Sequence, residues 1–375
     1  MRVKLEDVCE RGSSNIKQSD IIKMSGNYPI YGASGLAGKV NFYHQEQPYV
    51  AVVKDGAGIG RTTLNPAKSS VIGTMQYLIP KKNVLPEYLF YVVSYMHLEK
   101  YYTGATIPHI YFKDYKNEEF NLDNIEKQLE IIDVLGRCKK VIEARKQELV
   151  ELDSLTKARF VELFGDPVAN PMHWPVKRLK ELAIQINSGN TPKGGSENYV
   201  EKGITFFRSQ NVWKDRLEMD DIAYIDEKTH ESMKRSSLKH GDILMTKTGR
   251  INTENSSLGR AALYEGEDDM ANVNGHVYFI RLKEGVNNKF VLRVLVSPEY
   301  RDLIRSVCVG GIDKRQLNKE HIEEFPIIYP PSEMIDNYIE FVEQVNKSKF
   351  DTMTFAPIYA IINLYLHTYF YQGRR

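Results

Sequence analysis

Two distant stretches of this chain repeat the same local pattern. The run Tyr49–Leu64, YVAVVKDGAGIGRTTL, is echoed by DILMTKTG at 242–249 followed by SLGRAAL at 257–263. Two further pairs keep the register: EYLF at 87–90 with KFVL at 289–292, and EEFNL at 118–122 with EEFPI at 323–327. A long internal repeat predicts two related domains in one polypeptide. Two versions of one module with different loops suit a protein that reads two different targets at a set separation.

The length and composition agree with two or three folded domains. The chain has 375 residues, 42% of them hydrophobic and 26% charged, so that each domain can bury a core of its own. Its cysteines, Cys9, Cys138 and Cys308, match no zinc or disulfide spacing. The first residues, MRVKLED, are charged and contain no apolar signal segment. We therefore expect a cytoplasmic protein without a membrane partner.

The charge distribution excludes one simple route to a function. Residues 1–122 carry 14 basic and 11 acidic side chains, and residues 166–330 carry 24 of each. Neither segment is a basic polyelectrolyte, so bulk charge gives no argument for nucleic-acid binding. Such a role would need a local basic face or a basic partner.

The pattern within each copy predicts a mixed α+β domain. Strands are predicted at three β-branched or aromatic runs: 49–53, 242–246 and 277–282. Helices are predicted at the start of each copy, at 3–10 and 176–183, and again near its end, at 86–100 and 288–305. Gly-, Ser- and Asn-rich loops follow the opening helices.

A different kind of sequence joins the two copies. Residues 123–164 contain no proline and one glycine, Gly136. Apolar side chains recur there at heptad spacing: Leu135, Ile142 and Leu149 on one line, Cys138 and Leu152 on the next. Because Arg145, Thr156 and Arg159 interrupt this seam, a long strict coiled coil is not expected. A helix of about forty residues would span about 60 Å, and Gly165 and Pro167 predict its end. We interpret it as a spacer; the alternative is an ordinary helix packed on one domain.

Candidate catalytic patterns are incomplete. GAGIG at 56–60 follows an apolar strand, but Arg61 stands where a dinucleotide fingerprint needs its third glycine, so a hairpin turn is the better interpretation. Tyr329-Pro-Pro-Ser332 lacks the polar first residue of an amino-methyltransferase motif. The acidic run at 265–269 fits a solvated turn better than a metal site. The histidines, among them His109, His276 and His321, have no nucleophile and acid at a recognisable spacing. We predict neither a catalytic nor a metal site.

Several motifs in order carry a resemblance to a known family. The first copy contains NYPIYGASG at 27–35, KDGAGIGR at 54–61, SSVIGTM at 69–75 and GATIPHIYFKD at 104–114. The second contains SGNTPK at 188–193, FFRSQN at 206–211, HGDILMTKTG at 240–249 and NVNGH at 272–276. Over about residues 1–350 the chain resembles the specificity (S) subunits of type I restriction-modification enzymes.

The resemblance implies an architecture and a role. The expected fold is α+β, with related target-recognition domains at 1–122 and 166–330 in a pseudo-two-fold arrangement, a spacer helix at 123–165, and the start of a second spacer helix at 331–350. The implied protein is not an enzyme. Each domain reads one half of a bipartite, asymmetric site in double-stranded DNA. Methyltransferase (M) subunits dock on the helices, here through Leu135, Ile142, Leu149 and Leu152, and restriction (R) subunits join outside. S-adenosylmethionine, ATP and Mg are expected on those partners and no cofactor in this chain.

The candidate DNA contacts lie in polar loops that differ between the copies or beside glycine turns. Arg, Asn and Gln can pair with base edges, whereas Lys and hydroxyl side chains mainly hold phosphates. In the first copy they are Tyr31, Ser34, Lys54, Arg61, Thr106 and His109. In the second they are Thr191, Lys193, Arg208, Gln210, Asn211, Lys247, Thr248 and Arg250. For each residue a purely structural role in its turn is an equal alternative.

The end of the chain departs from the family pattern. A second charged helix is expected to end like FVELFG at 160–165, but 352–373 contains no Asp, Glu, Lys or Arg and is rich in Tyr and Phe. A membrane anchor is disfavoured because Pro357, Asn363, His367 and Gln372 interrupt the stretch. We interpret 351–375 as an atypical aromatic tail, replaced or frame-shifted, which puts the second helix and one docking surface in question. The rival functions are a stand-alone DNA-binding module without a methyltransferase partner and, third, an enzyme in its own right.

Overall fold

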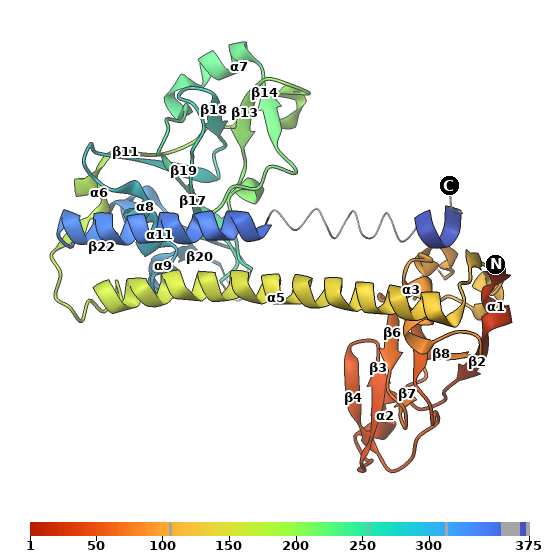
Figure 1. The fold of residues 1–375 in the computed structure, drawn as a ribbon. Coiled ribbons are helices and arrows are strands. Elements are labelled where there is room, and N and C mark those ends of the chain that lie inside the picture. The colour runs from red at the N-terminus through yellow and green to blue at the C-terminus, as the bar shows by residue number, and fades with distance from the viewer. Residues whose placement is uncertain (105–106, 252, 254, 312–313, 354–367, 373–375) are drawn as a thin grey trace. The chain divides into compact units, whose positions relative to one another are not determined.

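A computed structural model describes residues 1–104, 107–251, 253, 255–311, 314–353 and 368–372. The chain divides into two compact units (Figure 1). The first unit comprises Met1–Val150 with Phe350–Arg375, and the second comprises Glu151–Lys349. Each unit combines mainly antiparallel sheets with helices, so both are α+β domains.

The described residues of the first unit form three sheets. The central sheet has the order β2-β8-β5-β6, and its strand β5 is buried along its whole length because Val50, Val52 and their neighbours face the core on both sides. A smaller sheet, β4-β3-β7, and the pair β1-β9 complete the unit. The strands are β1 (Arg2–Lys4), β2 (Cys9–Ser13), β3 (Tyr28–Gly32), β4 (Gly35–Val40), β5 (Tyr49–Val53), β6 (Thr62–Asn65), β7 (Ser70–Val71), β8 (Met75–Pro80) and β9 (Glu119–Asn121). The helices are α1 (Leu5–Val8), α2 (Gln18–Ile21), α3 (Pro86–Ser94), η1 (Leu98–Tyr101) and α4 (Phe112–Tyr115).

The second unit repeats this plan with an added sheet. Its central sheet is β11-β19-β15-β17, the smaller one is β12-β14-β13-β18, and β10-β22 and β16-β21-β20 are further sheets. The strands are β10 (Val176–Arg178), β11 (Ala183–Ser188), β12 (Tyr199–Val200), β13 (Ile204–Phe207), β14 (Ala223–Ile225), β15 (Ile243–Thr246), β16 (Thr248–Gly249), β17 (Ala261–Leu263), β18 (Ala271–Val273), β19 (Val277–Leu282), β20 (Val309–Gly310), β21 (Arg315–Gln316) and β22 (Pro326–Ile328). The helices are α6 (Leu179–Leu182), η2 (Gly195–Asn198), η3 (Ser209–Asn211), α7 (Glu227–Ser232), η4 (Lys234–Ser236), α8 (Asn288–Leu295), α9 (Pro298–Val307) and α10 (Lys319–Glu323).

Strand pairing confirms the internal duplication. Strand β5 pairs antiparallel with β6 and β8, as β15 pairs with β17 and β19. The parallel pair β3–β7 has its counterpart in β13–β18. The hairpin predicted around the GAGIG run is present, since β5 and β6 are joined by residues 54–61, and Gly56 and Gly60 have φ of 94° and 81° there.

Two predictions of helices need correction. The openings at 3–10 and 176–183 are single helical turns, α1 and α6, each preceded and followed by a strand. The closing helices are interrupted: His97, at φ 52°, lies between α3 and η1, and Ser297 caps a new helix, α9, after α8 has ended. Pro298 at the first position of α9 lacks the N–H that a continuous helix would need.

The predicted central helix is present as α5 (Ile125–Phe164), which is 40 residues long. Ion pairs within the helix support it, such as Arg137 with Asp133 at 2.8 Å and Arg145 with Glu148 at 2.6 Å. Gly165 follows at φ 74°, and an added Cβ there would lie 2.8 Å from the ring of Pro171, so the chain turns away where a glycine is required. Neither the main core cluster of the first unit nor that of the second, as far as the chain is described, includes a residue of 136–159. The middle of α5 is therefore a connecting helix rather than part of a domain core.

The second helix also forms within the described residues. Helix α11 (Ser332–Met353) packs against the C-terminal part of α5 in the second unit, where the Tyr338 hydroxyl lies 3.4 Å from the carbonyl of Thr156 and Lys349 pairs with Asp153 at 2.6 Å. Four aromatic rings, Phe160, Phe164, Phe290 and Tyr338, make mutual contacts there. The second helix, which the unusual tail had put in question, therefore forms as far as residue 353.

Residues 368–372 have a defined place in the first unit. Residues 368–372 form the short helix η5, and Phe370 is fully buried in the first unit's core. The amide of Asn121 donates to the Tyr369 carbonyl at 3.1 Å, and the Tyr371 hydroxyl donates to the Val92 carbonyl at 2.5 Å. These five residues fit their site, which argues against the interpretation of a replaced or frame-shifted tail there. The rest of the aromatic tail, at 354–367 and 373–375, lies outside the described residues.

Candidate nucleic-acid interface

In the first unit, two loops that carry candidate residues are joined through their backbones. The amide of Ile110 donates to the Lys54 carbonyl at 2.9 Å, and the amide of Gly56 donates to the Pro108 carbonyl at 2.9 Å. The side chains join as well, since His109 Nδ1 lies 2.6 Å from a carboxylate oxygen of Asp55. The Lys54 ammonium is 3.9 Å from the same carboxylate. Lys54 and His109 therefore belong to one cluster, which Asp55 partly neutralises.

The remaining first-unit candidates lie elsewhere. Arg61 is exposed at the end of the β5–β6 loop and forms no ion pair with another described residue. Tyr31 is half-buried in β3, and Ser34 is exposed in the two-residue turn between β3 and β4. Those strands form the separate sheet β4-β3-β7. Thr106 lies outside the described residues.

The second unit builds the same pair of loops with different side chains. The amide of Leu317 donates to the Lys247 carbonyl at 2.9 Å, which matches the bond between Ile110 and Lys54. Strand β16 pairs Thr248 with Gln316, where the first unit pairs Asp55 with His109. The same backbone frame thus carries a His–Asp pair in one unit and a Thr–Gln pair in the other.

Arg208 and Gln210 converge on one carboxylate. Arg208 Nη2 lies 3.1 Å from Asp221, and the amide of Gln210 donates to the same carboxylate at 2.7 Å. These two donors, Gln210 foremost, hold the pKa of Asp221 below its ordinary value. The Arg208 side chain is 18% exposed, whereas Asp221 is 76% exposed. A base edge can reach these side chains only by competing with Asp221.

Asn211 has a structural position. It is buried, and its amide donates to the carbonyls of Glu218 and Asp221 at 3.1 and 2.9 Å while its oxygen accepts from the Arg208 amide. Asn211 therefore shapes the loop that presents Arg208 and Gln210. Thr191 and Lys193 are exposed in the loop after β11.

Beside Lys247 lies an open pocket of about 550 Å³. Two basic side chains, Arg250 and Lys314, line it together with the polar side chains Thr248, Thr253, Asn255 and Ser256. The pocket brings together two residues that were predicted to contact DNA, Thr248 and Arg250, with six that were not: Gly249, Thr253, Asn255, Ser256, Ser257 and Lys314.

Arg61 and Arg260 are counterparts with different environments. Their backbone carbonyls accept equivalent hydrogen bonds. The backbone amide of Val53 donates to the Arg61 carbonyl and that of Thr246 to the Arg260 carbonyl, both at 2.9 Å. Arg61 is exposed, whereas Arg260 is buried, with its guanidinium 3.9 Å from the centre of the Trp213 ring. Burial lowers the pKa of Arg260. The stacking of Arg260 on Trp213 holds this loop of the second unit in place, whereas the exposed Arg61 does not do so in the first unit.

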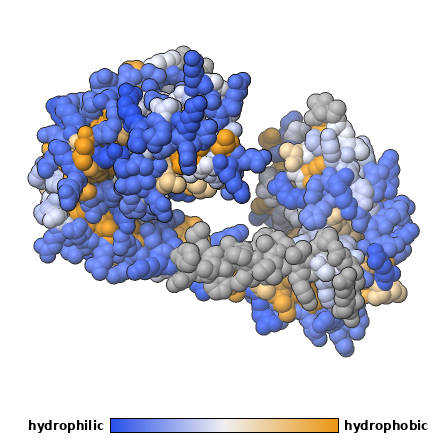
Figure 2. All heavy atoms as spheres, turned by 90° about the horizontal axis from the view of Figure 1, so that it is seen from above, coloured by the Kyte–Doolittle hydropathy of each residue, from blue (hydrophilic) through white to orange (hydrophobic). Residues whose placement is uncertain are grey.

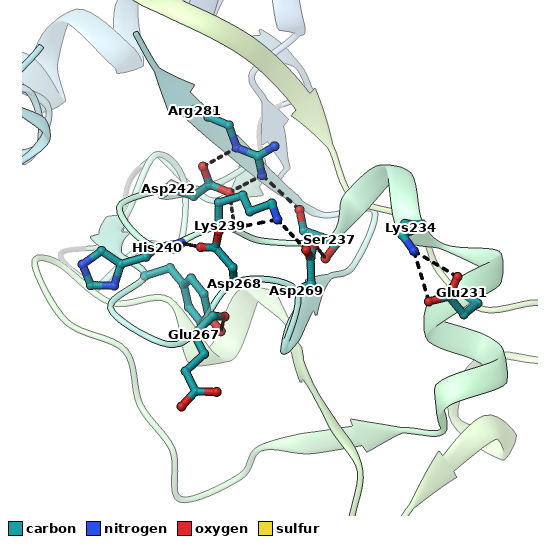
Figure 3. A network of polar contacts seen from close by, with 11 residues as sticks. Glu231, Lys234, Ser237, Lys239, His240, Asp242, Glu267, Asp268, Asp269 and Arg281 are labelled. Carbon is teal, nitrogen blue, oxygen red and sulfur yellow. Dashed lines mark hydrogen bonds and ion pairs between the residues drawn. The ribbon is translucent and has the colours of Figure 1, made fainter. Parts of the chain in front are cut away.

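A polar network braces the central sheet of the second unit (Figure 3). Asp242 is buried and accepts two bonds from Arg281, at 2.9 and 2.7 Å. Nearby, Asp269 accepts from Ser237 at 2.7 Å and pairs with Lys239. The acidic run 265–269 is thus tied to the fold through Asp268 and Asp269 rather than merely solvated. Among the described residues, no cluster of His, Cys, Asp or Glu could hold a metal ion.

The predicted docking residues of α5 divide into two groups. Leu135 is 7% exposed and belongs to the core of the first unit, so it faces inward and is unsuited to docking a partner. Ile142, Leu149 and Leu152 are half-buried. Exposed apolar side chains recur instead at Val134, Val141 and Leu155, which are 49%, 52% and 47% exposed.

Comparison with known proteins decides the family. The sequence pattern of the family described as "Type I restriction modification DNA specificity domain" matches residues 1–153 and again residues 171–354. The chain belongs to this family. The two matches coincide with the duplication seen in the strand pairing, so the specificity family accounts for both copies.

Individual relatives agree with this membership. The "Type I restriction enzyme MjaIX specificity subunit" of Methanocaldococcus jannaschii is 26% identical over 287 residues, which cover 71% of this chain and 63% of that protein. The type I restriction-modification S subunit of M. genitalium has a similar fold, with a TM-score of 0.61, 15% identity, and coverage of 98% of this chain and 95% of that one. A chain from a study of complex assembly and conformational transition of the type I R-M system gives a TM-score of 0.56 at 15% identity, covering 98% and 97%.

Membership gives this chain two copies of the DNA specificity domain of type I restriction-modification systems. None of the helices in the described part of the chain is both long and apolar enough to span a bilayer. Sequence reasoning missed Lys314, Arg260 and Asp221. The signal for Arg260 was available, because the echo of GIGR at 58–61 in SLGR at 257–260 aligns it with Arg61.

Proposed function

We propose that each domain of this specificity subunit reads one half of a bipartite, asymmetric DNA site, and that α5 sets the gap between the halves. The observation that carries the proposal is the shared backbone frame with different side chains. The frame around Lys54 and Lys247 is the same, while the paired side chains beside it are Asp55 with His109 in one unit and Thr248 with Gln316 in the other. Two readers with one scaffold and unlike contact residues suit two different half-sites.

The proposal includes partners. Methyltransferase (M) subunits dock on the helical segment, for which the exposed apolar residues Val134, Val141 and Leu155 are the candidates. Their separations are multiples of seven, which places them on neighbouring parts of one helix face. Restriction (R) subunits join the assembly outside this contact. S-adenosylmethionine, ATP and Mg belong to those subunits and none to this chain.

Within each domain we assign roles by accessibility. Arg61, Ser34, Thr191 and Lys193 are exposed and free to contact DNA directly. Arg208 and Gln210 read a base only after they release the Asp221 carboxylate, so Asp221 competes with the base for both side chains. Asn211 supports that loop from within.

A selection experiment tests this function. The full chain, assembled with its methyltransferase subunit, is incubated with random duplexes, and the bound fraction is sequenced. Two short words at a constant spacing support the proposal. A single uninterrupted word, or no enrichment while the assembly remains intact, would reject it.

A further inference from the structure

The open pocket beside β16 combines features that point to a ligand of one kind. Its rim carries two cations, Arg250 and Lys314, and neither forms an ion pair with another described residue. Residues 166–330 carry equal numbers of basic and acidic side chains, so two cations on one small concave surface form a local exception. Two cations on one concave surface attract an anion.

The polar side chains of the pocket supply hydrogen-bond donors. Among the described residues, the side chains of Thr248, Thr253 and Asn255 make no hydrogen bond, so their hydroxyl and amide groups remain available. The Ser256 hydroxyl accepts from the Leu258 amide at 3.1 Å and keeps its own proton to donate. Hydroxyl and amide donors beside Arg and Lys are the usual partners of phosphate oxygens.

The loop that forms the pocket wall is held in place before any ligand arrives. Arg260 donates to the carbonyls of Ser256, at 2.9 Å, and Asn255. The Ser257 hydroxyl donates to the Thr248 carbonyl at 2.7 Å, which ties the loop to β16. Arg301 donates to the Thr253 carbonyl at 3.2 Å. A wall fixed by side chains from several elements orders its donors at little further entropic cost on binding.

A further positive charge, that of the buried Arg260, lies next to the pocket wall. Arg260 is buried, forms no ion pair with another described residue, and has Arg301 and Arg216 close enough to lower its pKa further. The Arg260 guanidinium contacts the Trp213 ring, 3.9 Å away, and the carbonyls of Ser256 and Asn255, none of which carries a negative charge. Its charge therefore adds to the field that Arg250 and Lys314 create in the pocket.

We propose that this pocket binds a phosphate group, and that in the assembled protein this group is a backbone phosphate of the DNA. This inference rests on the proposed function and deepens it. It moves Arg250 from reading bases to holding the backbone, gives Thr248 a specific phosphate to hold, and adds Lys314 and Ser256 to the DNA contacts. The phosphate fixes the register of the second domain on the duplex, while sequence is read elsewhere in that domain.

The salt dependence of DNA binding tests the inference. The assembled wild-type protein and the variants R250Q and K314Q are titrated with a cognate and an unrelated duplex over a range of salt concentrations. Each variant is expected to lower the slope of log K against log salt by about 0.9, and to weaken both duplexes by the same factor. The control K228Q, which neutralises an exposed lysine of α7, is expected to leave the slope unchanged. An unchanged slope in both pocket variants, or a loss confined to the cognate duplex, would overturn the assignment.

A second readout separates this inference from the proposed function. The chain has two tryptophans, Trp174 and Trp213, so W174F leaves Trp213 as the reporter beside Arg260. Inorganic phosphate and a duplex are each titrated while Trp213 emission is followed. A change with duplex that K314Q abolishes supports the backbone phosphate. A change with inorganic phosphate alone, in a protein that binds DNA, would show a free-anion site and overturn the backbone assignment. If wild-type protein binds no duplex at all, the proposed function fails. A response to inorganic phosphate would then show only that the pocket binds a free anion, which overturns the backbone assignment as well.

Discussion

The ring of Phe370 lies edge-to-face against the ring of Tyr88, with centroids 5.6 Å apart and planes at 88°. In the second unit Phe164 meets Phe290 in the same manner, at 5.1 Å and 75°. Tyr88 and Phe290 occupy equivalent places near the start of α3 and α8. Phe370 thus completes the core of the first unit as Phe164 at the end of α5 completes the core of the second.

This relationship predicts a cost for removing the Phe370 ring. Since Phe370 is fully buried, F370A should destabilise the first unit by about 3 to 5 kcal/mol. Hydrogen exchange of the full chain measures the loss unit by unit, and faster exchange is expected in the first unit with the second unchanged. Y102A, which removes an aromatic ring that is 58% exposed, is the control. Equal protection in F370A and wild type would show that η5 contributes nothing to the first core.

The buried ion pair Asp242–Arg281 in Figure 3 should contribute more to stability than the exposed pair Glu231–Lys234. Asp242 is 1% exposed and Arg281 25% exposed, whereas Lys234 and Glu231 are 65% and 62% exposed. D242A leaves a largely buried guanidinium without its partner and should cost about 3 kcal/mol of unfolding free energy. E231A should change it by less than about 0.5 kcal/mol. Denaturant unfolding measures both, and similar losses would contradict the role given to Asp242.

The acidic turn predicts sensitivity to low pH. Hydrogen bonds from Lys239 and Ser237 lower the pKa of Asp269 below its ordinary value of 3.8. A carboxylate with a lowered pKa stabilises the fold above that ordinary value, and the contribution is lost as the pH falls through the folded-state pKa. Between about pH 5 and pH 3, wild-type protein should therefore lose more stability than D269N. Parallel stability curves for the two proteins would contradict this.

The exposed face of α5 predicts where a methyltransferase docks. The double variant V134Q/V141Q should reduce co-purification with that subunit, because it removes apolar area from the proposed contact. K139Q/K146Q is the matched control: its positions are also seven apart and exposed, but they lie on another side of the helix. Retained binding in V134Q/V141Q, or equal loss in both variants, would place the contact elsewhere.

The balanced charge predicts that partners are needed for tight DNA binding. Since few phosphates can be neutralised by this chain alone, the isolated chain should bind duplexes weakly at physiological salt. Gel shifts with and without the methyltransferase subunit measure the difference. Nanomolar, sequence-specific binding by the isolated chain would refute the requirement.

The sequence predicted the features that depend on local pattern. The duplication, the buried strand at Tyr49–Val53 and the end of α5 at Gly165 were all readable from repeats, β-branched runs and a glycine. Features that depend on distant partners were not. Leu135 matched a heptad seam, yet tertiary packing draws it into the first unit's core. The aromatic residues of 368–372 looked foreign to the family because only the folded chain shows what they contact. Asp221 gave no signal at all, since its pairing with Arg208 depends on a loop geometry.

Mapping methylated bases in cells tests the central claim most directly. The chain is expressed with its methyltransferase, either as wild type, as the first-domain variant K54A/R61A, or as the second-domain variant R208A/Q210A. Wild type should give one motif of two words at a fixed gap, and each variant should alter a different word while keeping the gap. A motif without a gap, or two variants that alter the same word, would contradict the account of two separate readers joined by α5.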